Sequence, residues 1–111
     1  MKTLLIAIAS TLAVWITVCP VSAQTEKGAQ VYAAQKCSMC HSIAGKGNAK
    51  GPLDDVGSKL TSDQIREWIV DPEGMTAKQK ATRKPPMKSK YATLPKDDLD
   101  ALVAYLASLK K

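Results

Sequence analysis

The pentapeptide Cys37-Ser38-Met39-Cys40-His41 determines which kind of site this chain carries. Two cysteines three residues apart, with a histidine directly after the second, are compatible with a metal clip, a redox dithiol or the attachment of a cofactor. On a helical turn the three residues stand at i, i+3 and i+4, so their side chains project from one face, about 5–6 Å apart. The rest of the chain has to discriminate among these sites.

Zinc and dithiol sites lack the partners they need. A structural zinc site takes four ligands, usually from two such pairs, but here there is one pair and His41 is the only histidine. A thioredoxin-like dithiol expects a βαβ context, and the chain shows no alternating strand pattern. The spacing Cys-x-x-Cys-His is typical of c-type haem, whose vinyl groups take up the two thiols. A disulfide between Cys37 and Cys40 is the alternative in a chain that has not received a cofactor, although the small core would then lack a group to fill it.

The first 23 residues are typical of an export signal. Lys2 gives a positive start, an apolar run follows over residues 4–18, and residues 21–23 are small enough for a signal peptidase. A membrane anchor is the alternative, but the run is shorter than the roughly 20 apolar residues of a membrane span. We therefore expect residues 1–23 to be cleaved, leaving one domain over residues 24–111 in the periplasm.

Removal of this segment leaves a basic protein with two cysteines in an oxidising compartment. One of the 16 basic residues, Lys2, is lost, so 15 remain against 10 acidic residues, a net charge of +5. No nucleic-acid motif accompanies the charge, so we expect no nucleic-acid partner. A basic surface favours an acidic protein partner or an anionic membrane face, and lysines that only keep the protein soluble are the alternative. We expect a monomer without stable membrane insertion.

Apolar side chains recur with helical spacing in three stretches, which predicts an all-α domain. The first stretch covers residues 26–40, the second residues 62–70, and the third begins near Pro95. A short helical turn is expected near residues 76–82. The third stretch carries one continuous apolar stripe. Its members are Leu99, Leu102, Val103, Leu106 and Leu109.

The second stretch has the clearest start signal. Thr61 suits an N-cap, and Gln64 stands where a capping box requires it. Leu60 is placed to pack back on Ile65, and Pro72 is expected to end the helix.

A histidine-bound iron leaves its opposite face open, and methionine is the obvious second ligand. The mature chain offers Met39, Met75 and Met87. Met39 lies inside the attachment turn and cannot reach the far face. Met87 follows Pro85 and Pro86, which stiffen its approach and lower the ordering cost. We predict Met87 as the distal axial ligand, with Met75 as the alternative and ordinary core packing as the other role open to a methionine.

Short stretches spread along the mature chain match one family in residue type and order. They are Gly28 and Tyr32, Cys37-Ser38-Met39-Cys40-His41, Gly51-Pro52-Leu53, Glu67-Trp68-Ile69-Val70-Asp71-Pro72, Pro86-Met87, Tyr91 and Leu102-Val103-Ala104-Tyr105-Leu106. In these stretches the chain resembles class I cytochrome c, the small monohaem electron carriers. The resemblance implies a cytochrome c fold, with three main helices and long loops wrapped around one covalently attached haem c.

The resemblance also implies how the haem iron is held. Cys37 and Cys40 would form the thioether bonds, His41 would be the proximal axial ligand, and Met87 the distal one. The chain departs from many relatives in carrying Lys88, rather than proline, after Met87. Its Gly-Pro-Leu stretch is also one residue shorter than the family pattern.

Further positions follow from the resemblance. Pro52 would offer its carbonyl to the ring N–H of His41, and Trp68 would line the haem on the methionine side. Tyr91 and Arg83 would contact the haem propionates.

The resemblance implies a helix crossing as well. Gly28 and Tyr32 would pack against the terminal helix near Leu102 and Tyr105, with Gly28 allowing the close approach.

The function implied is one-electron transfer rather than enzymatic catalysis. Ligation by histidine and methionine fills both axial positions, so oxygen and peroxide find no site on the iron. We therefore expect a carrier between respiratory or dehydrogenase partners. The alternatives are a cytochrome subunit of a larger oxidoreductase and a haem sensor or peroxidase-like protein with a labile methionine. Basic side chains expected around the haem edge are Lys36, Lys46, Lys84, Lys88 and Lys90.

Overall fold

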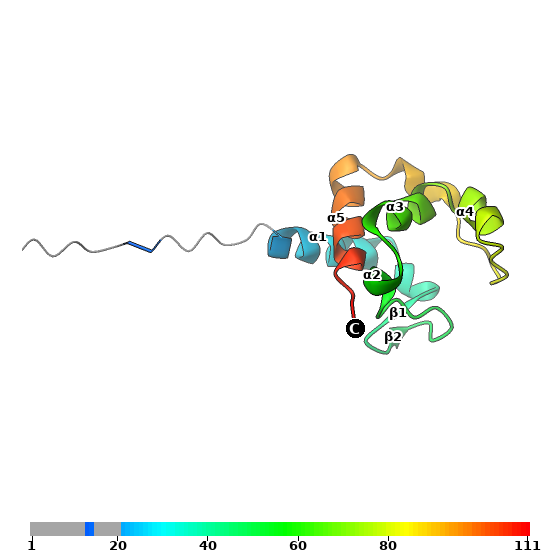
Figure 1. The fold of residues 1–111 in the computed structure, drawn as a ribbon, viewed down its shortest axis with the longest axis horizontal. Helices are drawn as coiled ribbons and strands as arrows, with labels where there is room; N and C mark the ends of the chain where they lie inside the picture. The colour runs from blue at the N-terminus through cyan, green and yellow to red at the C-terminus, as the bar shows by residue number, and fades with distance from the viewer. Residues whose placement is uncertain (1–12, 15–20) are drawn as a thin grey trace, which may run out of the picture.

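The computed structural model describes residues 13–14 and 21–111, so the expected export signal lies almost wholly outside the described residues. The elements are α1 (Val21–Ala34), η1 (Cys37–Met39), β1 (Ser42–Ile43), β2 (Lys46–Gly47), α2 (Val56–Lys59), α3 (Ser62–Val70), α4 (Pro72–Lys78), η2 (Ser89–Thr93) and α5 (Lys96–Ala107). The all-α class is confirmed, with one two-stranded hairpin added (Figure 1). Within the described ranges, no helix is long and apolar enough to cross a membrane.

Helices α1 and α5 cross in close contact, and this crossing organises the fold (Figure 1). Gly28 is buried where they meet, and a Cβ there would overlap the Ala101 carbonyl and the Tyr105 side chain. The rings of Tyr32 and Tyr105 meet edge to face, with centroids 6.1 Å apart. The close approach expected at Gly28 is therefore present, since only a residue without a side chain fits between the two backbones.

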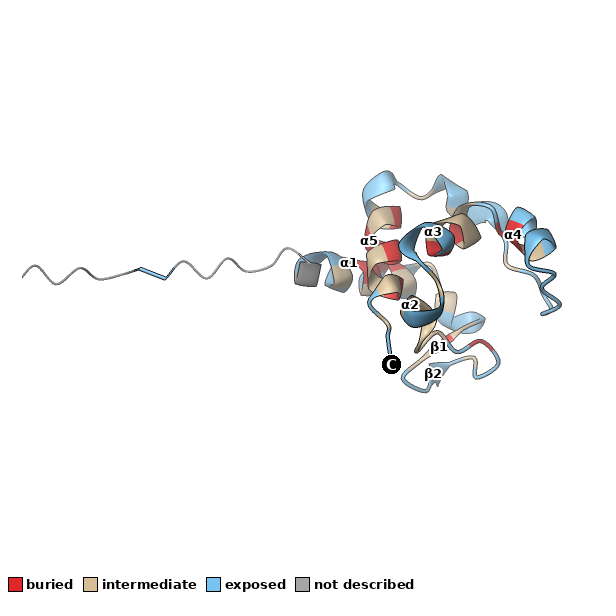
Figure 2. Cartoon of the chain, viewed as in Figure 1, coloured by how far each residue is buried: buried red, intermediate tan, exposed pale blue. Residues whose placement is uncertain are grey.

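The apolar core lies between α1, α3 and α5, whose buried faces turn toward one another (Figure 2). Four of the five residues expected in the terminal stripe are buried, and Leu109 lies just past the end of α5, half-buried. The core cluster consists of Val31, Ile65, Ile69, Leu99, Leu102, Val103 and Leu106.

Helix α3 begins and ends at the expected residues. The Thr61 hydroxyl accepts a hydrogen bond from the Gln64 N–H, and the Gln64 side chain accepts one from the Thr61 N–H. Two of the four free N–H groups at the helix start are satisfied in this way. The predicted capping box is confirmed.

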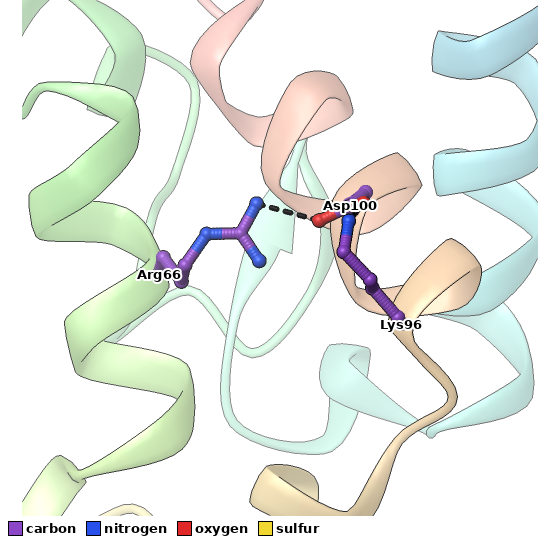
Figure 3. Close-up of polar contacts among 3 residues, drawn as sticks. All are labelled: Arg66, Lys96 and Asp100. Atoms are coloured by element: carbon purple, nitrogen blue, oxygen red, sulfur yellow. Dashed lines mark hydrogen bonds and ion pairs between the residues drawn. The ribbon is translucent and has the colours of Figure 1, made fainter.

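A polar contact joins α3 to α5 at the edge of the core (Figure 3). Arg66 Nη2 lies 2.7 Å from Asp100 Oδ1, and Lys96 Nζ lies 2.5 Å from Asp100 Oδ2. Hydrogen bonds from Lys96 and Arg66 lower the pKa of Asp100, so its carboxylate is charged at neutral pH.

Pro72 begins a helix as well as ending one. Asp71 is both the C-cap of α3 and the N-cap of α4. Its side chain accepts a hydrogen bond from the Gly74 N–H. Pro72 occupies the first turn of α4, where its missing N–H costs nothing. The turn expected at residues 76–82 is therefore wrong in position, because the cap at Asp71 starts the helix earlier. The short helix α2 was not predicted.

Candidate haem attachment site

The attachment turn is separate from α1. The first helix was expected to run to Cys40, but it ends at Ala34, and Lys36 has the left-handed backbone angles φ 56° and ψ 38°. This change of hand stops the helix and starts a new turn at Cys37. The His41 N–H donates to the Cys37 carbonyl at 2.9 Å, which closes one helical turn. Cys37, Cys40 and His41 therefore keep the one-face arrangement, although on a turn rather than on the long helix.

The two cysteines are free thiols in different environments. Cys37 is partly covered and Cys40 is exposed. Burial raises the pKa of the Cys37 thiol, the nearby Cys40 adds to the rise, and a backbone hydrogen bond opposes it. At neutral pH Cys37 is therefore a protonated thiol.

His41 is held as a neutral ring with one nitrogen engaged. Its Nδ1 lies 3.2 Å from the Gly51 carbonyl oxygen, so Nδ1 carries the proton and donates it there. Burial lowers the pKa of His41, and the Arg83 charge lowers it further, while the Gly51 hydrogen bond opposes both. The lone pair on Nε2 is then free to bind a metal, as in sites where a carbonyl orients a histidine ligand.

The hydrogen-bond acceptor differs from the expected one by one residue. Pro52 was expected to offer its carbonyl, but the structure places Gly51 against the ring. Ser42 N–H donates to Gly51 O at 3.0 Å, and Leu53 N–H donates to Ser42 O at 2.8 Å, which forms a parallel bridge at Pro52. Successive carbonyls along such an extended segment point in opposite directions, so Gly51 O faces His41 and Pro52 O does not.

Residues 37–54, the proximal segment, form a support for His41 that the sequence did not reveal. The hairpin β1–β2 turns at Ala44 and Gly45, both with positive φ. Gly47 has a φ of +107°, and a Cβ there would overlap the His41 carbonyl. The hairpin backbone thus lies directly on the attachment turn.

Asn48 ties the hairpin to the attachment turn. Its N–H donates to the Ser38 and His41 carbonyls at 3.0 Å each, and its Nδ2 donates to the Met39 carbonyl at 3.2 Å. Its own carbonyl accepts a hydrogen bond from Gly51 N–H at 3.1 Å. One residue therefore links the attachment turn to the carbonyl that orients the histidine. No local sequence pattern indicates this role, because Asn48 meets its partners only once the hairpin has folded onto the attachment turn.

Residues 79–88, the distal segment, connect α4 to η2 and carry Met87. The Lys84–Pro85 peptide bond is cis. The Arg83 guanidinium reaches the Cys40 carbonyl and lies against Gly51. Arg83 therefore lies beside the attachment turn, and its expected contact with the haem propionates stays a prediction.

The three methionines differ sharply in exposure. Met39 is 71% exposed and Met75 is 2% exposed, while Met87 is half-buried and packs against the core cluster. Met75 lies in α4. Met39 lies in η1, inside the attachment turn, and its exclusion as a ligand stays a prediction. Met87 is the methionine in the distal segment, and its role as the distal ligand stays a prediction.

The aromatic residues expected at the site lie at different depths. Trp68 is half-buried on α3 and makes no hydrogen bond within the part of the chain that the structure describes. Tyr91, on η2, packs against the core, and burial followed by the charges of Cys37 and Cys40 raises its pKa. Burial and then the charge of Cys37 raise the pKa of Tyr32 to about 12. Tyr32 and Tyr91 thus lie near Cys37, and a haem contact by Trp68 stays a prediction.

The donor set fits a covalently attached haem. Two free thiols and a neutral imidazole project from one turn, and the imidazole keeps its Nε2 lone pair. Across residues 13–14 and 21–111 no cluster of three or more metal-binding side chains exists that would favour a protein-only metal site. The buried Tyr32 hydroxyl has no hydrogen-bond partner among those residues, as expected where a further group completes the site. Cys37, Cys40 and His41 are therefore the residues that would hold the cofactor.

The chain belongs to the cytochrome c family, whose family model matches residues 25–110. Its cofactor is accordingly haem c with iron, bound covalently, and its chemistry is haem-based electron transfer. Among curated proteins it is similar to cytochrome c oxidase subunit 2 of Alkalihalophilus pseudofirmus, with 27% identity over 100 residues. That match covers 82% of this chain, and the chain spans only 27% of the relative's length. No solved structure matches the chain.

Proposed function

We propose that residues 24–111, once residues 1–23 have been removed, form a periplasmic one-electron carrier with a single haem c. Cys37 and Cys40 attach the haem, His41 is the proximal iron ligand, and Met87 is the distal ligand. The observation that carries the proposal is the turn that presents both thiols and a neutral imidazole on one face, with Nδ1 of His41 held by Gly51. The bound haem supplies an iron that alternates between Fe(II) and Fe(III).

The protein residues keep that site closed and fixed. Gly51 orients the ring of His41, and Met87 occupies the position that oxygen or peroxide would need. The half-buried Trp68 is proposed to line the haem on the methionine side and Tyr91 to contact the propionates, with Pro52 holding the backbone bridge beside His41. A site with both axial positions filled moves little when the electron arrives, which suits transfer rather than catalysis.

The basic surface near the site supports docking to acidic partners. The lysines expected around the haem edge are all exposed, and none forms an ion pair with a described acidic residue. We propose that the carrier acts as a monomer and that these lysines steer it to membrane or periplasmic oxidoreductases. Electron-transfer rates should fall as ionic strength rises, and a flat response would remove the steering claim. The five lysines are Lys36, Lys46, Lys84, Lys88 and Lys90.

An absorption spectrum of both redox states tests the haem and its ligands. We expect the bands of a thioether-bound haem and a weak near-infrared band from methionine bound to Fe(III). Met87→Ala should abolish that band, whereas Met75→Ala and Met39→Ala should leave it in place. A band lost in Met75→Ala but kept in Met87→Ala would show that Met75 is the ligand.

A sensor or peroxidase-like role has a different signature. It requires a methionine that leaves the iron readily, so carbon monoxide would bind rapidly to the reduced protein. Slow or absent binding supports the carrier.

A second candidate function rests on the similarity to a cytochrome c oxidase subunit. The chain matches about a quarter of that protein, so it would act as a cytochrome subunit held by a separate oxidoreductase. Purification from native membranes under mild detergent distinguishes the two. A fixed stoichiometry with oxidase subunits supports the second candidate, and recovery of the chain alone supports the carrier.

A further inference from the structure

Arg83 connects two segments that lie far apart in sequence. It belongs to the distal segment, yet its guanidinium donates a hydrogen bond to the carbonyl of Cys40, 43 residues earlier. No other side chain of the distal segment forms a hydrogen bond or ion pair with a described residue. Residues 79–81 are also tied to α4 by backbone hydrogen bonds, so it is the position of residues 82–88 that depends on this one side chain, apart from apolar packing.

Gly51 makes room for the guanidinium. Gly51 is buried, and a Cβ on it would overlap Arg83 Nη1 and the Cys40 carbonyl oxygen. The carbonyl of the same glycine receives the His41 ring hydrogen bond at 3.2 Å. The guanidinium thus touches both residues that flank the histidine on the proximal side, the second attachment cysteine and the orienting glycine.

The contact has mechanical and electrostatic consequences. An arginine presents several N–H donors in a rigid plane, so a bond to a backbone carbonyl restrains the loop that carries it. Its charge is permanent, and a fixed cation beside a redox centre favours the state with less positive charge. That state is the reduced one.

We propose that Arg83 is a positioning residue of the haem site, which fastens the Met87-bearing distal segment to the attachment turn and places a fixed positive charge beside His41. The electrostatic part rests on the proposed electron-transfer function. The fastening part concerns the polypeptide alone.

Three variants separate charge, hydrogen bonding and position. Arg83→Gln removes the charge, Arg83→Lys keeps the charge without the planar fork, and Lys84→Gln removes the neighbouring exposed charge. Lys84 is a matched control because it forms no hydrogen bond or ion pair with a described residue. Both positions are exposed, so none of the variants opens a cavity in the core.

The first measurement is the midpoint potential of the purified holoprotein. Arg83→Gln should shift the Fe(III)/Fe(II) ratio at a fixed applied potential about tenfold toward Fe(III), which is 59 mV for one electron. Lys84→Gln should shift it less than twofold, because solvent screens a charge that is not held against the site. Arg83→Lys should fall between these two variants, because it keeps the charge but holds it less firmly against the Cys40 carbonyl. Equal shifts in Arg83→Gln and Lys84→Gln would overturn the electrostatic part.

The second measurement is the NMR order parameter of the backbone amides over the distal segment, which does not depend on what binds the iron. Both Arg83 variants should have lower order parameters than the parent protein in this segment, and Lys84→Gln should not. Unchanged order parameters in Arg83→Gln would overturn the fastening part. Because the proposed function fails instead by absence of a thioether-bound haem or of the methionine band, the two failures are distinguishable.

Discussion

The proximal and distal segments are held in opposite ways. The proximal segment is fixed by backbone hydrogen bonds among its own residues, through the attachment turn, the hairpin and the bridge at Pro52. Residues 82–88 of the distal segment donate no backbone hydrogen bond to a described residue, and Arg83 provides their one polar tie. This difference indicates that a bound haem would meet a preformed proximal segment around His41, whereas the distal segment that carries Met87 would be free to adjust its position. Substitutions in the two segments should therefore differ in what they change.

Gly47→Ala should have the largest effect because it breaks the proximal support. The φ of +107° strains any side chain, which costs about 1–3 kcal/mol, and overlap with the His41 carbonyl adds about 1–3 kcal/mol. We expect the free energy of unfolding, measured with urea, to fall by about 4 kcal/mol. Gly45→Ala is the matched control: its φ is +77° with open space around it, so the loss should be about 1–2 kcal/mol. Equal losses would mean that the hairpin does not press on the attachment turn.

Met75→Ala should have the next largest effect on stability. It tests the packing of α4, the helix that precedes the distal segment. Met75 is 2% exposed, so truncation leaves a cavity beneath α4 and should cost about 3 kcal/mol. Met39→Ala, at a side chain that is 71% exposed, should stay within about 0.5 kcal/mol of the parent protein. Chemical denaturation of both variants checks this. A small loss in Met75→Ala would show that this part of the structure collapses readily.

Asn48→Ala should weaken the proximal segment by a smaller amount. It removes the amide bond to the Met39 carbonyl and the acceptor for the Lys50 N–H, at a cost of about 1 kcal/mol. Asn48→Asp keeps the acceptor and loses only the donor, so it should retain part of that stability. Thermal unfolding of the three proteins at one pH gives the order. If Asn48→Ala is neutral, the backbone bonds of residue 48 suffice without its side chain.

Ala44→Asn should strengthen the proximal segment. Ala44 has a φ of +52° at the first position of a two-residue hairpin turn, followed by Gly45. Asparagine tolerates the left-handed region better than alanine, and Asn-Gly is the preferred pair for this turn. We expect a gain of about 0.5–1 kcal/mol in the free energy of unfolding. A loss would show that the turn angles are imposed by the Ala44 N–H bond to Asp54 rather than by turn preference.

Asp100→Asn should have the smallest effect on stability. It serves as a reference because Asp100 lies in α5, outside both the proximal and the distal segment. Hydrogen bonds from Lys96 and Arg66 lower the pKa of Asp100, so its contribution is present above the unfolded pKa, near 4, and is lost as the pH falls through the folded value. The pair is partly exposed and screened, which keeps the contribution small. Melting temperatures should differ between parent and variant at pH 7 and converge at pH 2–3. A constant difference would show that charge is not the cause.

Sequence alone predicted the elements whose signals are local. The capping residues Thr61 and Gln64 defined the start of α3, and the spacing of Leu99, Leu102 and Leu106 defined the buried face of α5. These signals act within two or three turns, so tertiary contacts did not need to be known.

Prediction failed where the structure depends on distant contacts or unusual backbone angles. The left-handed Lys36 ended α1 early, although lysine is an ordinary helix residue. The hairpin strands have two residues each, too few for an alternating pattern. Arg83 and Asn48 act on partners that no spacing rule relates to them. The general constellation of Cys37, Cys40 and His41 was nevertheless predictable, because chemistry imposes its spacing.

The crossing at Gly28 has a consequence for how the chain is made. It pairs the first described helix with the last one, so the principal interface closes a very long loop. During synthesis the turn that carries Cys37 and Cys40 emerges from the ribosome before α5 does, so the core cannot assemble until α5 has emerged. Until α5 packs on α1, the free thiols of Cys37 and Cys40 belong to a chain whose core is incomplete, which leaves them open to the attachment of a cofactor.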